Sequence, residues 1–150
     1  MFFATDLDTV THGIQLAVAP VFLLTAVAAM IGTVAGRLAR IIDRARLLED
    51  RIEAGLAGEP AARAYGELGQ LRARGRLVNA CIALLTFCAI LIGLTIITLF
   101  LGETTEMQIF RLATVFFLSG VIFFLAALLC FFAETLLATR MLKFGRSKDA

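Results

Sequence analysis

The chain has 150 residues, of which 60% are hydrophobic and 17% charged, and its mean hydropathy is +0.91. A soluble domain of this length has about half of its residues apolar and about a quarter charged, so the composition excludes an ordinary soluble domain. The formal net charge of +2 does not by itself indicate any class of partner.

The apolar residues are concentrated in three runs without any Lys, Arg, Asp or Glu: residues 14–35, 77–101 and 112–133. Each run exceeds the about 18–20 residues that cross about 30 Å of hydrocarbon. A soluble bundle would place polar residues at every third or fourth position, and these are missing. The sequence therefore predicts an all-α integral membrane protein with three transmembrane helices, at about residues 14–36, 77–101 and 110–134.

The first helix is expected to continue beyond its apolar run, because no Pro or turn signal follows. After Gly36, apolar residues recur at helical spacing, with Arg and Asp on the other faces: they are Leu38, Ile41, Ile42, Ala45, Leu48 and Ile52. We predict one helix from about Ile14 to about Ala54. At 1.5 Å per residue it would project roughly 25–30 Å beyond the membrane.

The stretch "AGLAGEP" then predicts a turn. Gly55 and Gly58 suit the end of one helix, and Pro60 suits the first turn of the next. The returning helix carries apolar residues on one side, at Ala61, Ala64, Leu68 and Leu71, and leads directly into the second span. Residues 37–76 are thus predicted to form an antiparallel helical hairpin, within a single membrane domain that covers residues 1–150.

The basic residues are distributed unevenly. Between the first two runs lie Arg37, Arg40, Arg44, Arg46, Arg51, Arg63, Arg72, Arg74 and Arg76. The C-terminal tail adds further Lys and Arg, whereas the N-terminus has none and the second loop has only Arg111. The positive-inside rule places the hairpin and C-terminus in the cytoplasm and the N-terminus outside. The N-terminus also lacks the basic region of a signal peptide, so we expect the first span to be retained.

The stretches "IQLAVAPVFLLTAVAAMIGTVAGRLARIIDRARLLE" and "RARGRLVNACIALLT" resemble the bacterial membrane-protein family catalogued as domain of unknown function 2721. The resemblance covers nearly the whole chain. It implies three spans in a bacterial inner membrane; the positive-inside rule then makes the N-terminus periplasmic and the C-terminus cytoplasmic. It brings no catalytic or binding residues, because the family has no established activity.

Small residues form a ladder on the inner half of the first helix, at Ala28, Gly32 and Gly36. Such ladders let helix backbones approach closely in lipid. Two interpretations remain open: contact between protomers of a homo-oligomer, or packing against the other two spans of the same chain.

Polar residues on the same helix are candidates to line a pathway. Gln15 would lie at the outer mouth and Arg37 and Arg40 near the inner mouth, with Thr25 and Thr33 between them. The alternatives are that the Thr hydroxyls bond to carbonyls of their own helix and that the arginines extend sideways to headgroups.

Charged residues mark the cytoplasmic boundary of the spans. Glu134 closes the third span, either as an ion or proton site or as the partner of headgroup water or a nearby arginine. Five arginines are predicted to contact anionic lipid or a partner, at about 1 kcal/mol each near the surface: Arg44, Arg46, Arg72, Arg74 and Arg76.

Nothing in the sequence predicts an enzyme or a cofactor. It contains no Walker loop, nucleophile–base pair, metal-ligand cluster or glycine-rich phosphate turn. The three cysteines, in the spans, are expected to be small packing residues. Nucleic acid is not expected as a partner, because the basic residues lie next to the bilayer and alternate with acids.

Two functions remain. The first is a homo-oligomeric ion channel or permeation pathway lined by several copies of the first helix, since three helices alone cannot enclose a pore. The second is a structural, assembly or regulatory membrane protein whose basic hairpin engages anionic headgroups or a partner.

Overall fold

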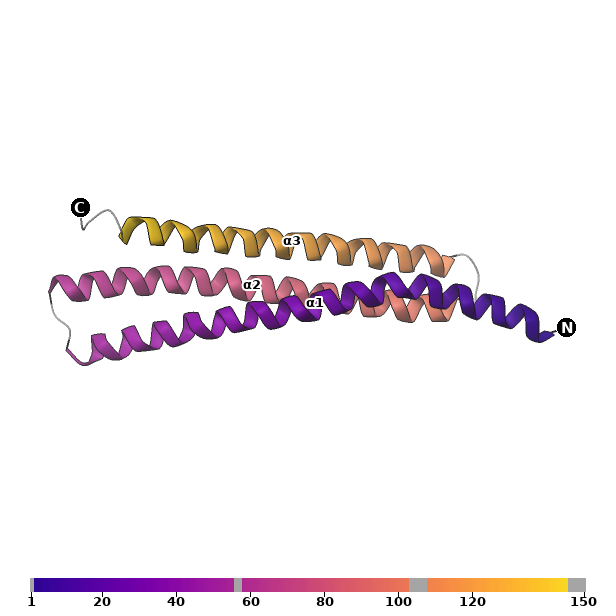
Figure 1. Ribbon diagram of the computed structural model, residues 1–150, viewed down its shortest axis with the longest axis horizontal. Helices are drawn as coiled ribbons and strands as arrows, with labels where there is room; N and C mark the ends of the chain where they lie inside the picture. The colour runs from indigo at the N-terminus through magenta and orange to yellow at the C-terminus, as the bar shows by residue number, and fades with distance from the viewer. Residues whose placement is uncertain (1, 56–57, 103–107, 146–150) are drawn as a thin grey trace. The chain divides into compact units, whose positions relative to one another are not determined.

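The protein consists of three long helices (Figure 1). The computed structural model describes the backbone of residues 2–55, 58–102 and 108–145, and the side chains of residues 14–55, 58–101 and 111–139. The helices are α1 (Phe2–Glu53), α2 (Glu59–Gly102) and α3 (Gln108–Gly145). Each contains one apolar run and is long and apolar enough to cross a membrane. The prediction of an all-α chain with three helices that can span a membrane is therefore confirmed.

Two helices extend further than the sequence predicted. The start of α1 at Phe2 shows that the predicted start at about Ile14 is wrong. The segment before Ile14 contains no Pro, and adding a turn to an existing helix costs far less than nucleating a new one. For the same reason, α3 continues past the end of its apolar run to Gly145.

The turn between α1 and α2 follows the prediction. Gly55 and Gly58 have φ angles of 95° and 77°, which residues with a Cβ rarely adopt. The carbonyl of Gly58 accepts the first hydrogen bonds of α2, from the backbone N–H of Ala61 at 3.1 Å and of Ala62 at 3.3 Å. Pro60 lies in this first turn, where its missing N–H needs no partner.

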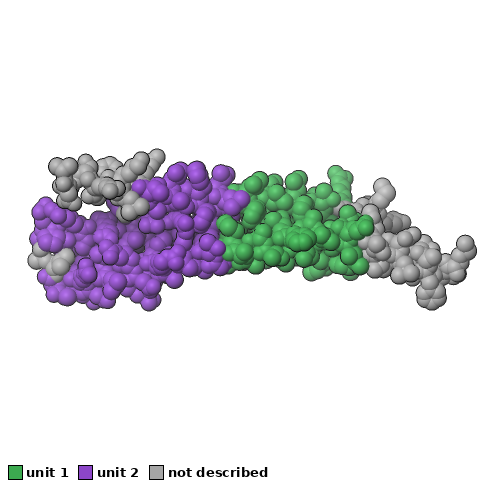
Figure 2. All heavy atoms as spheres, viewed as in Figure 1, with its two compact units in different colours: residues 1–31, 84–126 green, residues 32–83, 127–150 purple. Residues whose placement is uncertain are grey.

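The chain divides into two compact units, which Figure 2 colours separately. Unit 1 comprises Met1–Ile31 and Leu84–Ala126. Its core is apolar, with Val27, Leu85 and Ile92 fully buried. The rings of Phe87 and Phe123 stack with centroids 6.0 Å apart, which brings α2 against α3.

Unit 2 comprises Gly32–Ala83 and Ala127–Ala150. It contains the segment predicted as the hairpin, and several of the apolar positions picked out by helical spacing contribute to its core, although one of them, Ile42, is 40% exposed. The buried residues are Val34, Ile41, Leu48, Ala64, Leu68, Leu71, Val78, Cys81 and Ala127. Ion pairs join α1 to α2 on its surface, Arg44 with Glu67 at 3.0 Å and Arg72 with Glu49 at 3.1 Å.

Large apolar side chains point outward along the candidate spans. Phe22 on α1 is 72% exposed and Leu129 on α3 is 70% exposed. Such surfaces are unfavourable in water over this length and suit a hydrocarbon environment. The outward faces of both units therefore agree with three membrane-spanning helices.

Candidate functional site

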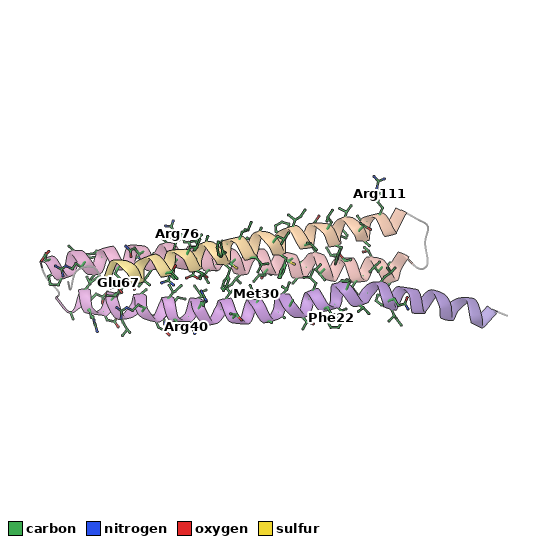
Figure 3. All side chains as sticks on the ribbon, turned by 45° about the horizontal axis from the view of Figure 1, so that its top comes forward. Phe22, Met30, Arg40, Glu67, Arg76 and Arg111 are labelled. Carbon is green, nitrogen blue, oxygen red and sulfur yellow. The ribbon has the colours of Figure 1, made fainter. Side chains whose placement is uncertain are left out.

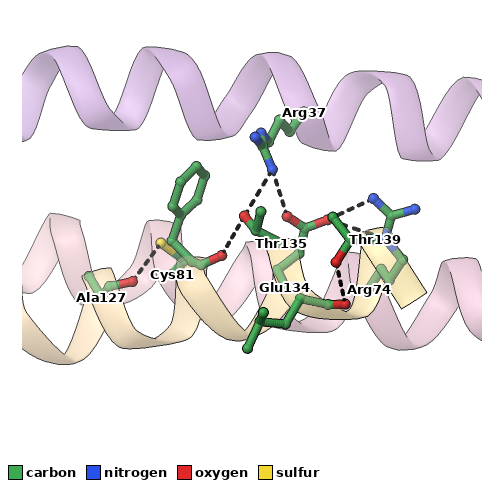
Figure 4. A network of polar contacts seen from close by, with 9 residues as sticks. Arg37, Arg74, Cys81, Ala127, Glu134, Thr135 and Thr139 are labelled. Atoms are coloured by element: carbon green, nitrogen blue, oxygen red, sulfur yellow. Dashed lines mark hydrogen bonds and ion pairs between the residues drawn. The ribbon is translucent and has the colours of Figure 1, made fainter. Parts of the chain in front are cut away.

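The most polar buried group among the described side chains is Glu134 of α3, which is 1% exposed. Its carboxylate accepts hydrogen bonds from two arginines on two other helices (Figure 4). Arg37 of α1 donates from Nη1 to Oε2 at 2.9 Å. Arg74 of α2 donates from Nε and Nη2 to Oε1, at 3.1 and 2.7 Å. We call these three residues the Glu134 cluster; it joins all three helices of unit 2.

Further contacts hold Arg37 in place. Its Nη1 also donates to Thr135 Oγ1 at 3.3 Å, and its guanidinium lies 4.6 Å from the ring centroid of Phe131. Burial of an ionised carboxylate is unfavourable unless charged partners replace its water. Here both carboxylate oxygens have such partners. The guanidiniums themselves stay partly exposed, with side-chain accessibilities of 34% for Arg37 and 22% for Arg74.

The cluster decides between the two interpretations of Glu134. Both oxygens are engaged by arginines, so the structure shows an ion pair and not an open carboxylate. Two guanidiniums face one carboxylate, which leaves the cluster with an excess of one positive charge. The side chain of Arg140, the basic residue that follows along the chain, lies outside the described residues.

Sequence reasoning assigned the members of the cluster to different roles. Arg37 was a pore-lining candidate and Arg74 a lipid contact; the pathway itself stays a prediction. A signal for the cluster was present. Arg37 lies two residues after the first apolar run, Arg74 three residues before the second, and Glu134 directly after the third. In three antiparallel spans these ends lie at the same level.

Two cysteine thiols connect α2 and α3 within unit 2. Cys81 Sγ donates to the carbonyl of Ala127 at 3.3 Å, and Cys130 Sγ donates to the carbonyl of Leu77 at 3.2 Å. These are weak hydrogen bonds. All three cysteines are free, and among the described side chains no group of three His, Cys, Asp or Glu is placed to hold a metal ion.

Charge is segregated along the hairpin. We define the base as residues 36–46 and 72–76 together with Glu134, and the tip as residues 47–71. The base holds seven arginines and two carboxylates, a balance of +5. The tip holds two arginines and five carboxylates, a balance of −3. The base is thus strongly basic and the tip acidic, although the whole chain carries only +2.

Only some of the basal arginines are neutralised. Four have ion pairs: Arg37 and Arg74 with Glu134, Arg44 with Glu67, and Arg72 with Glu49. Among the described residues, no carboxylate pairs with the remaining three, which are Arg40, Arg46 and Arg76. All three are exposed, and Figure 3 shows Arg40 on α1 and Arg76 on α2.

One side of the base contains an open hollow of about 320 Å³. Three arginines of α1 and one of α2 line it, together with two apolar side chains: Arg37, Arg40, Arg44, Arg74, Ile41 and Leu71. On α1, the three arginines follow the spacing i, i+3 and i+7, which places them on one face of the helix. The hollow is therefore a site of concentrated positive charge.

The other pathway candidates lie on the surface of α1. Gln15, Thr25 and Thr33 are all exposed. The hydroxyl of Thr25 donates to the carbonyl of Val21 at 3.2 Å, as expected for a Thr that bonds to its own helix. None of these three residues belongs to the Glu134 cluster.

The small-residue ladder is not filled by its own chain at its inner end. A Cβ added at Gly32 or at Gly36 would meet no atom of the described residues within 4 Å. Ala28 and Gly32 are exposed, and Gly36 is half-buried. Close packing against α2 or α3 therefore does not explain these two glycines, which leaves lipid or another chain beside them.

Comparisons with known proteins give a family but no activity. A search of the curated proteins and a search of the solved structures each found no match. The family described as "Protein of unknown function (DUF2721)" matches residues 17–144, which include the hairpin, the Glu134 cluster and all of the candidate spans except residues 14–16. The chain is therefore a multi-pass membrane protein and belongs to the DUF2721 family.

Proposed function

We propose that this chain is a structural or regulatory membrane protein without enzymatic activity, and that the base of its hairpin engages anionic lipid headgroups. The observation that carries the proposal is the charge segregation, +5 at the base and −3 at the tip. Basic residues next to a span gain about 1 kcal/mol each from an anionic leaflet, and the gain falls off within a Debye length. Arginines concentrated next to the spans, with carboxylates farther from them, fit this decrease of the gain with distance from the membrane.

The same distribution supports an orientation. We propose that the hairpin and the C-terminus lie in the cytoplasm of a bacterium and the N-terminus in the periplasm. Single cysteines at Asp8 and Ala62, in a cysteine-free variant, test this with an impermeant thiol reagent on intact spheroplasts. We expect labelling at position 8 only, and labelling at position 62 before permeabilisation would reverse the orientation.

Lipid engagement is tested with two matched double variants. Arg46→Gln with Arg76→Gln removes two unpaired charges from the base, and Arg51→Gln with Arg63→Gln removes two charges from the tip, where Arg63 is paired with the exposed Glu59 at 3.2 Å. We expect the basal variant to bind phosphatidylglycerol at least about fivefold more weakly than wild type in native mass spectrometry. The tip variant should retain as much as wild type, and added salt should weaken retention by wild type.

Equal retention by the two variants would contradict the proposal, since charge at the base would then have no special role. Phosphatidylcholine serves as the uncharged comparison in the same measurement. A protein that retains both lipids equally has no preference for anionic headgroups, and a role as a lipid-engaging scaffold would be abandoned.

A homo-oligomeric permeation pathway is the second candidate. The space beside Gly32 and Gly36 favours it, because close approach of a second chain would fill that space. Against it, Arg37 is ion-paired with Glu134 inside one chain, so an unpaired ring of Arg37 side chains is not available to select ions.

Native mass spectrometry of Gly32→Ile and Gly36→Ile tests the oligomer. We expect a branched side chain to separate neighbouring helices and to shift the protein toward monomer. Proteoliposomes that stay impermeable to potassium and chloride over a range of voltage and pH would remove the pathway and leave the lipid-engaging protein.

A further inference from the structure

The hollow at the base is the strongest unexplained feature of unit 2. Four guanidiniums line it, and two carboxylates, Glu134 and Glu67, are paired with three of them. The four positive and two negative charges leave a local balance of +2. Arg40 and Arg44 are also neighbours at i and i+4 on α1, where like charges repel. The site therefore favours an anion that lies between these side chains.

Donors for such an anion are present. A guanidinium has five N–H groups on three nitrogens. The ion pairs with Glu134 and Glu67 use one nitrogen of Arg37 and two each of Arg44 and Arg74. Each keeps at least one nitrogen outside these pairs. Arg40 has no carboxylate partner among the described residues and lines the same hollow.

We propose that this hollow is a binding site for the phosphate group of one anionic phospholipid per chain, with Arg40 as its principal ligand. The planar fork of Arg matches two phosphate oxygens, and such charge-assisted pairs are short and strong. Arg37, Arg44 and Arg74 supply the surrounding positive charge and further donors. This inference rests on the proposed engagement of anionic lipid and gives it a defined site.

The position of the hollow along α1 fits a lipid phosphate. The apolar run ends next to Gly36, and Arg40 lies four residues later, about 6 Å farther along the helix axis. The headgroup layer on each side of the hydrocarbon is about 5–8 Å thick. Arg40 thus stands at the depth where phosphates of the adjacent leaflet lie.

The depth of the hollow favours a lipid over a free ion. Ile41 and Leu71 line the hollow beside the arginines but are only 7% and 6% exposed, so they offer an acyl chain little surface. A phosphate at the level of the headgroups is supplied by the leaflet itself, at a high local concentration. We therefore assign the ligand to the membrane.

The test compares two arginines of the same helix. Arg40 and Arg46 are both exposed and without an ion pair among the described residues, but only Arg40 lines the hollow. Phosphatidylglycerol is titrated into each detergent-solubilised variant, and bound lipids are counted by native mass spectrometry. We expect wild type to bind one lipid tightly, Arg40→Gln to lose at least about tenfold in affinity, and Arg46→Gln to lose less than about threefold.

Two further arms make the assignment specific. Arg40→Lys keeps the charge but not the fork, so it should recover only part of the affinity. Inorganic phosphate in excess should leave the bound lipid in place. Displacement of the lipid by inorganic phosphate would overturn the lipid assignment in favour of a soluble anion.

The outcomes also separate this site from the proposed function. Equal losses for Arg40→Gln and Arg46→Gln would overturn the site and leave lipid engagement by general charge. No preference of wild type for phosphatidylglycerol over phosphatidylcholine would overturn both. A thermal melt of Arg40→Gln that matches wild type shows that the variant is folded; because Arg40 makes no ion pair among the described residues, we expect this match.

Discussion

Units 1 and 2 contain parts of the same three helices but are stabilised differently. In unit 1, apolar side chains make the contacts, as in the packing of Phe87 on Phe123. In unit 2, a buried carboxylate with two arginines lies beside the apolar core. A long helix can therefore change the chemistry of its packing along its length without any break in its backbone.

The hollows of the two units show the same difference. In unit 1, a hollow of about 290 Å³ is lined mainly by apolar side chains: Leu16, Ala19, Pro20, Thr95, Leu99, Ala113, Thr114 and Phe117. The hollow at the base of the hairpin, in unit 2, is of similar size, about 320 Å³, but is lined by four arginines. The two hollows therefore differ in the charge of the side chains that line them and not in their size. For this reason we assign a ligand only to the hollow of unit 2.

The largest effect is expected for Glu134→Gln. The variant leaves Arg37 and Arg74 facing an uncharged amide, and removal of one partner from a buried pair costs about 3–5 kcal/mol. Because both guanidiniums are partly exposed and can turn toward headgroups, we expect about 2–4 kcal/mol in a denaturant titration of the micelle-bound protein. Hydrogen exchange should rise in unit 2 and stay unchanged in unit 1.

A double-mutant cycle checks the mechanism of this loss. Arg37→Gln combined with Glu134→Gln should cost less than the sum of the single changes, since the pair is removed as a whole. Additive losses, or a rise in exchange spread equally over both units, would mean that the Glu134 cluster is not what holds unit 2 together.

The next largest effect is expected in unit 1, at Gly120 of α3. A Cβ there would lie 2.9 Å from Ile92 Cδ1 and 3.3 Å from Ile92 Cγ1. Gly120→Val should therefore separate α2 from α3 and cost about 1–3 kcal/mol by overpacking. The matched control is Gly93→Val, since a Cβ at Gly93 meets nothing within 4 Å.

Thermal unfolding of both variants in the same micelle provides the measurement. If Gly93→Val destabilises as much as Gly120→Val, the loss comes from the branched residue itself and not from contact with Ile92. The double variant Gly120→Val with Ile92→Ala should lose less than the sum of the two single changes, because the shorter side chain makes room for the added methyl groups.

The two units also differ in how far the sequence predicts them. In unit 2, polar and apolar residues alternate at helical spacing, and this pattern correctly picks out Ile41 and Leu48 on α1 and Leu68 on α2 as buried. In unit 1, nearly every position is apolar, so the pattern does not tell Val27, which is fully buried, from Phe22, which is 72% exposed. Periodicity predicts an inner face only where the outer face is polar.

An ion pair of Glu134 with a nearby arginine was one of the expected alternatives, but its two partners were not identified, for another reason. Its members come from three helices, at residues 37, 74 and 134, and sequence spacing carries no information about contacts between helices. The sequence predicts that all three residues lie at the same level, next to the ends of the apolar runs. Which of them pair depends on how each helix is rotated about its own axis, and the sequence does not give this rotation. The turn glycines, Gly55 and Gly58, were predicted correctly because their requirement is local.

The smallest effect is expected for Glu67→Gln, which removes the partner of Arg44. This pair joins the same kinds of charged group as the Glu134 cluster, at a similar distance of 3.0 Å, but the side chains of Arg44 and Glu67 are 55% and 38% exposed. Exposed pairs contribute about 0.2–1 kcal/mol, and salt screens them. We expect a loss in that range at low salt and none at high salt, in the denaturant titration used for Glu134→Gln.

The loss for Glu134→Gln should persist at high salt, because counter-ions do not reach a carboxylate that is 1% exposed. If salt removed both losses alike, burial would not distinguish the two ion pairs, and the contrast between the cluster and the surface of unit 2 would have to be given up.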